Sequence, residues 1–448
     1  MNTLSFFLLA GAISASAQGA PDTLGYVVRL TDAKTVVLDF NEKIGAAAGQ
    51  SFSIFQEGAD LKHPVTGQSL GKLETPVADG VLKEIFPLYS LGILSATPTQ
   101  PIKPGMRARL KPLAATVTPP AAGTASQGKA PRWRGPLFDY QATALAVGDL
   151  KGDGHVQAAL SDGRHVFLYP YPPTDEKPFA QFSHPGTSPR ILSLEAADLN
   201  ANGRAEIFAS LYNDAFARFE TIVLELDAQG QLVEIADLPY LVRKYQDPSG
   251  APLLAAQQVV DDRSFPFATI YPLTFQDGKY AAGRPAVKFN KYQPDWLYDF
   301  TFTTLNSKPA TIFVSNTELI GVQFDKGGSI KTTDNYGQTP HRVRWSGDRL
   351  LNFRPAMPVR YDAKGFAGLY LIRNLAALGG LAGPFGIFSN GELVRLGWNG
   401  LSLSPDWTAS LGGYAAGVAL VEAPGRPAEL AVAVVGAAEK TSLWGFEP

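Results

Sequence analysis

The 448-residue chain contains no cysteine. Disulfides, thiolate metal sites and a lipid-modified N-terminal cysteine are therefore excluded. Net charge is also nearly absent, because 39 Lys and Arg residues against 41 Asp and Glu residues leave −2 at pH 7. That balance gives neither a basic footprint for nucleic acid nor a polybasic segment for an anionic membrane.

The motifs of common enzyme families are missing as well. The sequence has no H-E-x-x-H, no P-loop and no G-x-G-x-x-G that opens a helix, and its five histidines are dispersed without the spacing of zinc ligands. Gly67–Gly71 fits G-x-S-x-G, but it follows a Pro-Val-Thr turn instead of the strand that precedes a nucleophile elbow. We identify no catalytic and no cofactor-binding residue.

Long apolar runs are confined to the N-terminus. Residues 1–17 combine a mostly apolar stretch, Leu4–Ile13, with the small residues Ala15–Ala17. This pattern predicts a signal peptide, although no Lys or Arg precedes the stretch. No later segment approaches the length of a membrane helix. We expect a soluble mature protein that is periplasmic or secreted.

The residues that are present favour many short strands. Glycine (44), proline (34) and aromatic residues (11%) are typical of strands joined by turns. Residues 24–110 contain short alternating apolar runs and predict a small β-barrel or sandwich module. Residues 111–130 are mostly Ala, Pro, Thr and Gly, and predict a flexible linker.

The module at 24–110 contains the runs Val36–Asp39, Ile44–Phe52 and His63–Gly71. These runs resemble the C-terminal domain of the flagellar assembly protein T family, with His63 in place of the usual Asp. The resemblance implies a structural and assembly element of the cell envelope. An unrelated small β domain with a common Pro-x-x-Gly turn is the alternative.

Residues 131–448 show a loose repeat. The apolar strands that could take the innermost position of each unit begin near Thr143, Leu192, Leu241, Leu297, Phe353 and Tyr414. The steps of 49 to 61 residues, with about four strands in each unit, are typical of propeller blades. The 318 residues give about 53 for each of six blades, and seven blades stay open. The last unit is one strand short, so we expect Trp133–Tyr140 to supply its edge and close the ring.

A turn in the second unit carries the most specific motif. Its first, third, fifth and ninth places hold Asp198, Asn200, Asn202 and Glu206, and its sixth place holds Gly203. Oxygen ligands at this spacing, with a glycine where the loop needs a positive φ, predict a calcium site. The alternative is a tight turn made by Asn, Asp and Gly without metal.

A weaker copy of this turn spans residues 149–155. Lys151 replaces a ligand and Gln157 stands where a carboxylate would close the site, so we expect a plain turn. The loop at 198–206, followed by Ile207-Phe208, resembles the FG-GAP and VCBS repeats of integrin-α-like β-propellers. That resemblance implies calcium loops between blade strands and a use in adhesion or scaffolding.

Together these features predict an all-β protein: a signal peptide, a small module, a linker and a propeller at 131–448. The function that we expect is non-enzymatic binding or scaffolding in a bacterial envelope, with an envelope protein or a glycan as partner. The alternative is a lyase or hydrolase that acts on polysaccharide at the propeller face, because fold alone does not exclude an enzyme.

Overall fold

The computed structural model describes residues 23–448 except 32–33, 42–43, 45, 47–49, 63–68, 96–97, 111–127, 187, 247–251, 260–268, 284–294, 316, 325–328, 346–348, 377–387, 424 and 437. The predicted signal peptide, most of the predicted linker and the turn at His63–Gln68 lie outside these residues. The chain divides into two compact units, Met1–Ala122 and Gly123–Pro448. No described residue belongs to an apolar helix long enough to cross a membrane.

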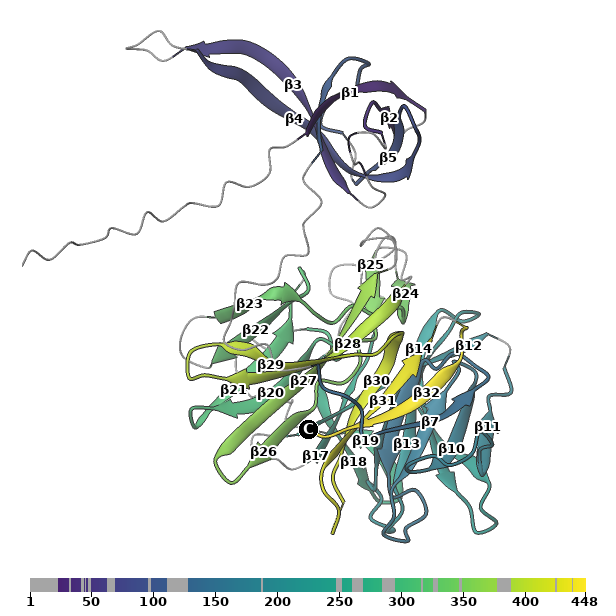
Figure 1. Ribbon diagram of the computed structural model, residues 1–448. Helices are drawn as coiled ribbons and strands as arrows, with labels where there is room; N and C mark the ends of the chain where they lie inside the picture. The colour runs from purple at the N-terminus through teal and green to yellow at the C-terminus, as the bar shows by residue number, and fades with distance from the viewer. Residues whose placement is uncertain are drawn as a thin grey trace, which may run out of the picture. The chain divides into compact units, whose positions relative to one another are not determined.

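The first unit is a closed barrel of six strands in the order β1-β2-β5-β4-β3-β6 (Figure 1). The strands are β1 (Thr23–Leu30), β2 (Thr35–Leu38), β3 (Ser51–Lys62), β4 (Ser69–Ile85), β5 (Ser90–Leu94) and β6 (Arg107–Leu110). Phe52 is fully buried inside the barrel, and a Cβ at Gly80 or Gly92 would lie 2.4 Å from its ring. These two glycines therefore make room for the aromatic core, and the predicted β module is confirmed.

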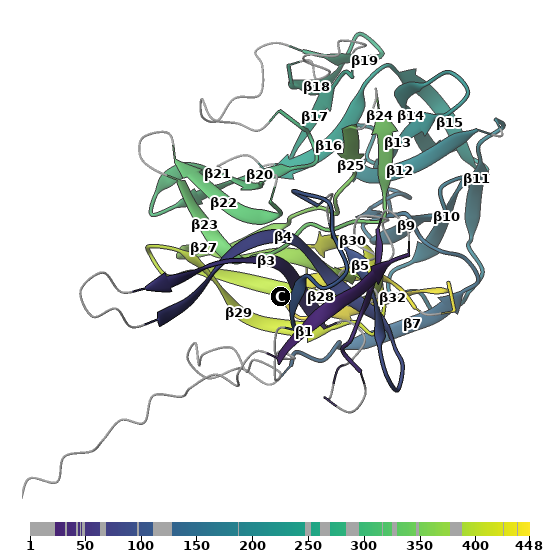
Figure 2. The same cartoon turned by 90° about the horizontal axis from the view of Figure 1, so that it is seen from above.

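The second unit is a propeller of six blades with four strands each (Figures 1 and 2). Blade 1 comprises β8 (Ala144–Gly148), β9 (Gln157–Ser161), β10 (His165–Pro170) and β11 (Ala180–Ser183). Blade 2 comprises β12 (Pro189–Ala197), β13 (Glu206–Asn213), β14 (Arg218–Leu226) and β15 (Leu232–Leu238). Blade 3 comprises β16 (Leu241–Gln246), β17 (Pro252–Gln257), β18 (Tyr271–Gln276) and β19 (Lys279–Ala282). The prediction of six blades is confirmed.

The other three blades follow the same antiparallel order. Blade 4 comprises β20 (Phe300–Leu305), β21 (Lys308–Val314), β22 (Leu319–Phe324) and β23 (Ser329–Asn335). Blade 5 comprises β26 (Val359–Asp362), β27 (Gly365–Ala376), β28 (Phe388–Trp398) and β29 (Leu403–Ser410). Blade 6 comprises β30 (Tyr414–Val421), β31 (Glu429–Val435), β32 (Thr441–Phe446) and β7 (Trp133–Phe138).

Burial within a blade follows the position of the strand. Every residue of β13 is buried, because neighbouring blades cover both faces of the middle strands. β15 lies at the outer edge of the same blade, where only its first and last residues are buried and the others are partly or fully exposed. This difference explains why the middle strands appear in the sequence as continuous apolar runs.

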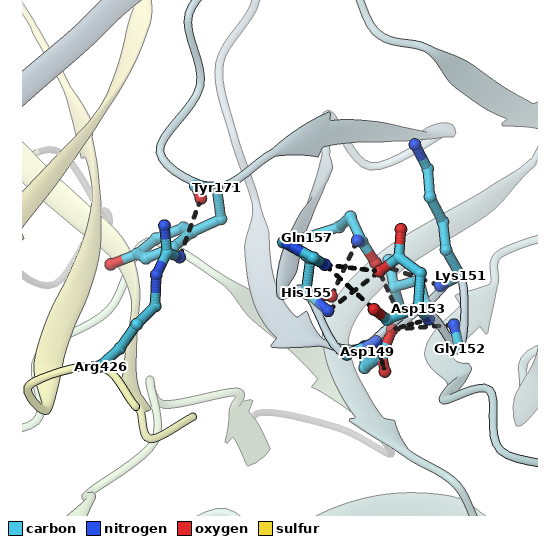
Figure 3. Close-up of polar contacts among 10 residues, drawn as sticks. Asp149, Lys151, Gly152, Asp153, His155, Gln157, Tyr171 and Arg426 are labelled. Atoms are coloured by element: carbon cyan, nitrogen blue, oxygen red, sulfur yellow. Dashed lines mark hydrogen bonds and ion pairs between the residues drawn. The ribbon is translucent and has the colours of Figure 1, made fainter. Parts of the chain in front are cut away.

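The ring closes as predicted, with β7 paired to β32. Glu429 on β31 joins the two ends of the ring: it accepts hydrogen bonds from Trp133 Nε1 and from the Tyr171 hydroxyl, both at 2.9 Å. Arg426 also donates to the Tyr171 carbonyl oxygen at 3.5 Å (Figure 3). Strand pairing thus closes the ring within blade 6, and the side chains of Glu429 and Arg426 fasten blade 6 to Tyr171 of blade 1.

The insertion between blades 4 and 5 was not predicted. Its hairpin consists of β24 (Arg342–Trp345) and β25 (Arg349–Asn352), which we call the crossing hairpin. The ring of Trp345 contacts Tyr212 and Phe219 of blade 2, with centroids 6.2 and 5.2 Å apart. Blade 2 stands on the opposite side of a six-membered ring from this insertion, so the hairpin crosses the propeller axis (Figures 1 and 2).

The crossing hairpin also corrects one predicted strand. Phe353 was expected near the start of an innermost strand, but it follows β25 and packs against Trp296 and Tyr298, at centroid distances of 5.5 and 4.7 Å. The innermost strand of blade 5 is β26, which begins at Val359. Phe353 is buried under the crossing hairpin, so its apolar character reflects this second layer of packing.

Candidate functional site

The predicted calcium loop lies between β12 and β13, as expected, and its glycine has the left-handed backbone, with φ of 88° at Gly203. Asp198 accepts hydrogen bonds from the amides of Asn202 and Gly203 at 3.1 and 2.9 Å. The amide oxygen of Asn202 in turn accepts from the amide of Arg204 at 2.9 Å. Asp198 and Asn202, two of the side chains that hold this turn in shape, were thus identified by sequence.

Glu206 has a separate task within the same loop. Its buried carboxylate accepts from the amides of Leu199 and Asn200 at 2.8 and 3.1 Å, and from the hydroxyl of Tyr280 at 2.7 Å. Burial raises the pKa of Glu206, while the Tyr280 hydrogen bond opposes that rise. The carboxylate therefore braces the start of the loop and links it to blade 3.

The weaker copy in blade 1 is built in the same way (Figure 3). Asp149 accepts from the amides of Gly152 and Gly154, both at 2.8 Å. Gln157 accepts from the amides of Leu150 and Lys151 at 2.7 and 3.2 Å, where Glu206 acts in blade 2. A neutral amide thus performs the brace in blade 1, and the expected plain turn is what these contacts describe.

The two loops also contact each other. The amide of Ala205 donates to the carbonyl oxygen of Asp149 at 2.8 Å. A Cβ on Gly152 would lie 2.7 Å from the Gly203 carbonyl oxygen, so only glycine fits between the loops. The turn loops of blades 1 and 2 therefore contact each other, in addition to the packing between their two sheets.

Whether calcium fits the loop at 198–206 depends on the hydrogen bonds that its predicted ligands already make. Asn200 and Asn202 direct their amide nitrogens to the carboxylate of Glu225, at 3.1 and 2.9 Å. Within the described ranges, no three or more Asp, Glu or His side chains are grouped so as to hold a metal ion. The loop is thus already stabilised by its own hydrogen bonds, and calcium at Asp198, Asn200, Asn202 and Glu206 stays a prediction.

A cavity lined by the inner strands of the propeller lies elsewhere, on its axis. It has a volume of about 140 Å³ and is lined by the inner strands β8, β12, β16, β20 and β30 and by residues 353–359. Phe353 and Arg354 place the end of the crossing hairpin in this lining. All six blades or their connecting segments therefore contribute to one cavity.

Two buried ion pairs surround this axial cavity. Glu195 of β12 and Arg243 of β16 are 93 to 94% buried and pair at 3.2 Å. The guanidinium of Arg243 also stacks on Tyr298, 5.2 Å from the ring centroid. Burial raises the pKa of Glu195, and Arg243 opposes the rise. The attraction between the two charges offsets part of the free energy that is needed to remove them from water.

The second pair joins Arg354 to Asp299, which lies directly before β20. Burial raises the pKa of Asp299 to about 6, although Arg354 favours the charged form. Since Arg354 follows the crossing hairpin, this pair fastens the insertion to blade 4. Glu195 and Asp299 therefore each form an ion pair with an arginine.

Lys244 is the remaining charge in the lining. Its ammonium donates to the carbonyl oxygen of Ala196 at 2.9 Å, and no carboxylate of a described residue forms an ion pair with it. Burial lowers the pKa of Lys244, and the charge of Glu195 opposes that fall. Counted by formal charge with both acid–arginine pairs ionised, Lys244 leaves one positive charge in excess in the lining.

Sequence reasoning missed these axial residues. A signal was present, since Glu195, Arg243 and Lys244 interrupt apolar runs that were identified as innermost strands. Charged residues at such places are rarely buried unless they are paired or functional. The nucleophile elbow, which the sequence already disfavoured, finds no support: Ser69 opens the long strand β4 instead of a helix.

Comparison with known proteins adds little to this description. No family model matches the chain, and no curated protein matches it. Among solved structures, one titled as BBS1N in complex with ARL6DN aligns at 11% identity and a TM-score of 0.34, covering 88% of this chain and 98% of that chain. A subtype N11 neuraminidase-like protein of the strain A/flat-faced bat/Peru aligns at 10% identity and a TM-score of 0.37, covering 72% and 95%. At these scores the likenesses decide nothing about function.

Proposed function

We propose that this chain is an exported bacterial protein of the cell envelope that binds or scaffolds a partner and does not catalyse a reaction. The barrel serves as an assembly element, as its resemblance to the flagellar assembly protein T family implies. The propeller, with FG-GAP and VCBS-like turns, recognises a protein or a glycan. Calcium in the loop at 198–206 belongs to the same proposal.

One observation carries the choice of binding over hydrolysis. Among the described residues that line the axial cavity, Glu195 is the only acid, and it is already paired with Arg243. Glycoside hydrolysis generally needs two carboxylates on either side of the scissile bond. The cavity supports recognition of a ligand more readily than its cleavage.

In-cell crosslinking tests this proposal. Phe216 and Leu401 are 73% and 80% exposed in turns of blades 2 and 5, and each can be replaced by a photoreactive amino acid in the full chain. Leu88 of the barrel, 71% exposed, gives a matched position outside the propeller. We expect envelope fractionation and a discrete crosslinked partner from the propeller positions. Cytoplasmic protein, or no crosslink at either propeller position, would contradict the proposal.

The second candidate is an enzyme acting on polysaccharide, and the buried Glu195–Arg243 pair beside Tyr245 favours it, because a lyase can operate with one base. Release of reducing or unsaturated ends from uronate-containing polysaccharides measures this activity. A rate that falls at least about 100-fold in Glu195→Gln would support the enzyme and overturn the binding proposal.

A further inference from the structure

The axial cavity has polar atoms that the protein leaves unsatisfied. Gln246 Oε1 and Arg354 Nε are buried and have no hydrogen-bond partner among the described residues. Both residues line the cavity, and Arg354 is 93% buried. A buried polar atom without a hydrogen-bond partner destabilises the folded protein. A ligand that supplied a donor for Gln246 and an acceptor for Arg354 would offset this destabilisation.

The charge of the cavity restricts the ligand further. Glu195 pairs with Arg243 and Asp299 pairs with Arg354, whereas Lys244 forms no ion pair with a carboxylate of the described residues and is influenced only by the charge of Glu195. A single unmatched ammonium complements one negative charge, whereas a dianion would carry an unpaired charge into a buried site. A monoanion is therefore the best match.

Size and wall chemistry complete the description. About 140 Å³ is close to the volume of an engineered apolar cavity that holds benzene, so the ligand has roughly six to ten non-hydrogen atoms. The walls between the polar groups are apolar: Ala144, Leu194, Met357, Ala416 and Val418 lie among them. Such walls suit a short carbon skeleton.

We propose that the axial cavity binds a compact hydroxycarboxylate, with Lys244 pairing with its carboxylate, Gln246 accepting from a hydroxyl and Arg354 donating to a ligand oxygen. This inference rests on the proposed use of the propeller as a recognition module. It adds a ligand class and the three residues that select it.

Calorimetric titration of the full chain with D-glycerate tests the site. We expect binding by the wild type, no measurable binding of glycerol, and weaker binding of inorganic phosphate. Lys244→Met removes the ammonium and keeps the rest of the unbranched side chain at similar length, so its affinity for glycerate should fall at least about tenfold. Lys364→Met, at an exposed turn of blade 5, is the matched control and should bind like the wild type.

A second variant tests the inference if the Lys244→Met protein does not fold. Gln246→Glu keeps the size of the side chain and adds a negative charge to the cavity that would hold the anion, so glycerate binding should be lost while far-UV circular dichroism stays unchanged. Equal affinity in wild type, Lys244→Met and Gln246→Glu would overturn the inference, as would glycerol binding as tightly as glycerate. Absence of glycerate binding at millimolar concentration would also overturn it.

The two proposals fail separately. Propeller crosslinks to an envelope partner without glycerate binding would leave the binding proposal intact and remove the ligand. Glycerate binding without any envelope crosslink would support the ligand site and remove the envelope partner.

Discussion

Gln157 in blade 1 and Glu206 in blade 2 hold the same place in successive blades and make the same contacts. Each accepts hydrogen bonds from the second and third amides of its loop. One side chain is neutral and the other ionisable, so the shared task is to brace the turn.

Replacement of Glu206 tests this brace. Glu206→Gln should change the unfolding free energy by less than about 1 kcal/mol, because one amide oxygen can accept from both loop amides, as that of Gln157 does, while the amide nitrogen can donate to the Tyr280 hydroxyl. Glu206→Ala leaves the Leu199 and Asn200 amides and the Tyr280 hydroxyl unpaired, and should cost about 2–4 kcal/mol. Urea unfolding measures both, with Gln157→Ala as the parallel change in blade 1. Equal losses in Glu206→Gln and Glu206→Ala would contradict the brace.

Metal removal tests the calcium prediction. If the loop at 198–206 binds calcium, 100 Kd of free ion should stabilise the wild type by about 2.7 kcal/mol, and EDTA should reverse the gain. Glu206→Gln removes one of the two predicted anionic ligands, so its gain should be smaller. Differential scanning calorimetry with calcium, magnesium or EDTA gives the comparison. Superimposable curves in calcium and EDTA would remove calcium from the description of this protein.

His341 predicts a dependence of stability on pH. Its ring is buried, its Nε2 has no hydrogen-bond partner among described residues, and burial lowers its pKa to about 4 from 6.5. Between these values the unfolded chain binds the proton more readily, so this group's contribution is complete above about pH 6.5 and is lost as the pH falls toward 4. From pH 7 to pH 5 it amounts to about 2 kcal/mol.

The variant His341→Phe isolates this contribution. Its unfolding free energy should vary less between pH 7 and pH 5 than that of the wild type, since no proton is taken up at this position. Chemical unfolding at a series of pH values measures the two slopes. Parallel slopes would show that His341 is not the group responsible.

The contacts of Glu429 predict that this residue stabilises the closed ring. Glu429→Ala leaves the indole of Trp133 and the hydroxyl of Tyr171 without their acceptor, and should cost about 2–4 kcal/mol. Glu422→Ala, at an exposed site after β30, should change stability by less than about 0.5 kcal/mol. Urea unfolding followed by tryptophan fluorescence compares them, and similar values for both variants would rule out a closing role for Glu429.

The sequence by itself determined the local features of this protein. Alternating and continuous apolar runs predicted strands, their spacing predicted six blades, and the missing strand at the end predicted that Trp133–Tyr140 closes the ring. The turn at Asp198–Glu206 was placed correctly between strands. These features depend on neighbours within a few residues or on a regular repeat, so composition and spacing are enough to reveal them.

Only the tertiary structure decided where the chemistry lies. Glu195 and Arg243 are 48 residues apart and meet because blades 2 and 3 are adjacent, while Arg354 reaches the axis because the crossing hairpin spans the ring. The spacing of strands in the sequence does not predict which charges form ion pairs or which segment after the crossing hairpin lines the axial cavity. Those contacts depend on closure of the whole ring, which brings residues from all six blades to one cavity.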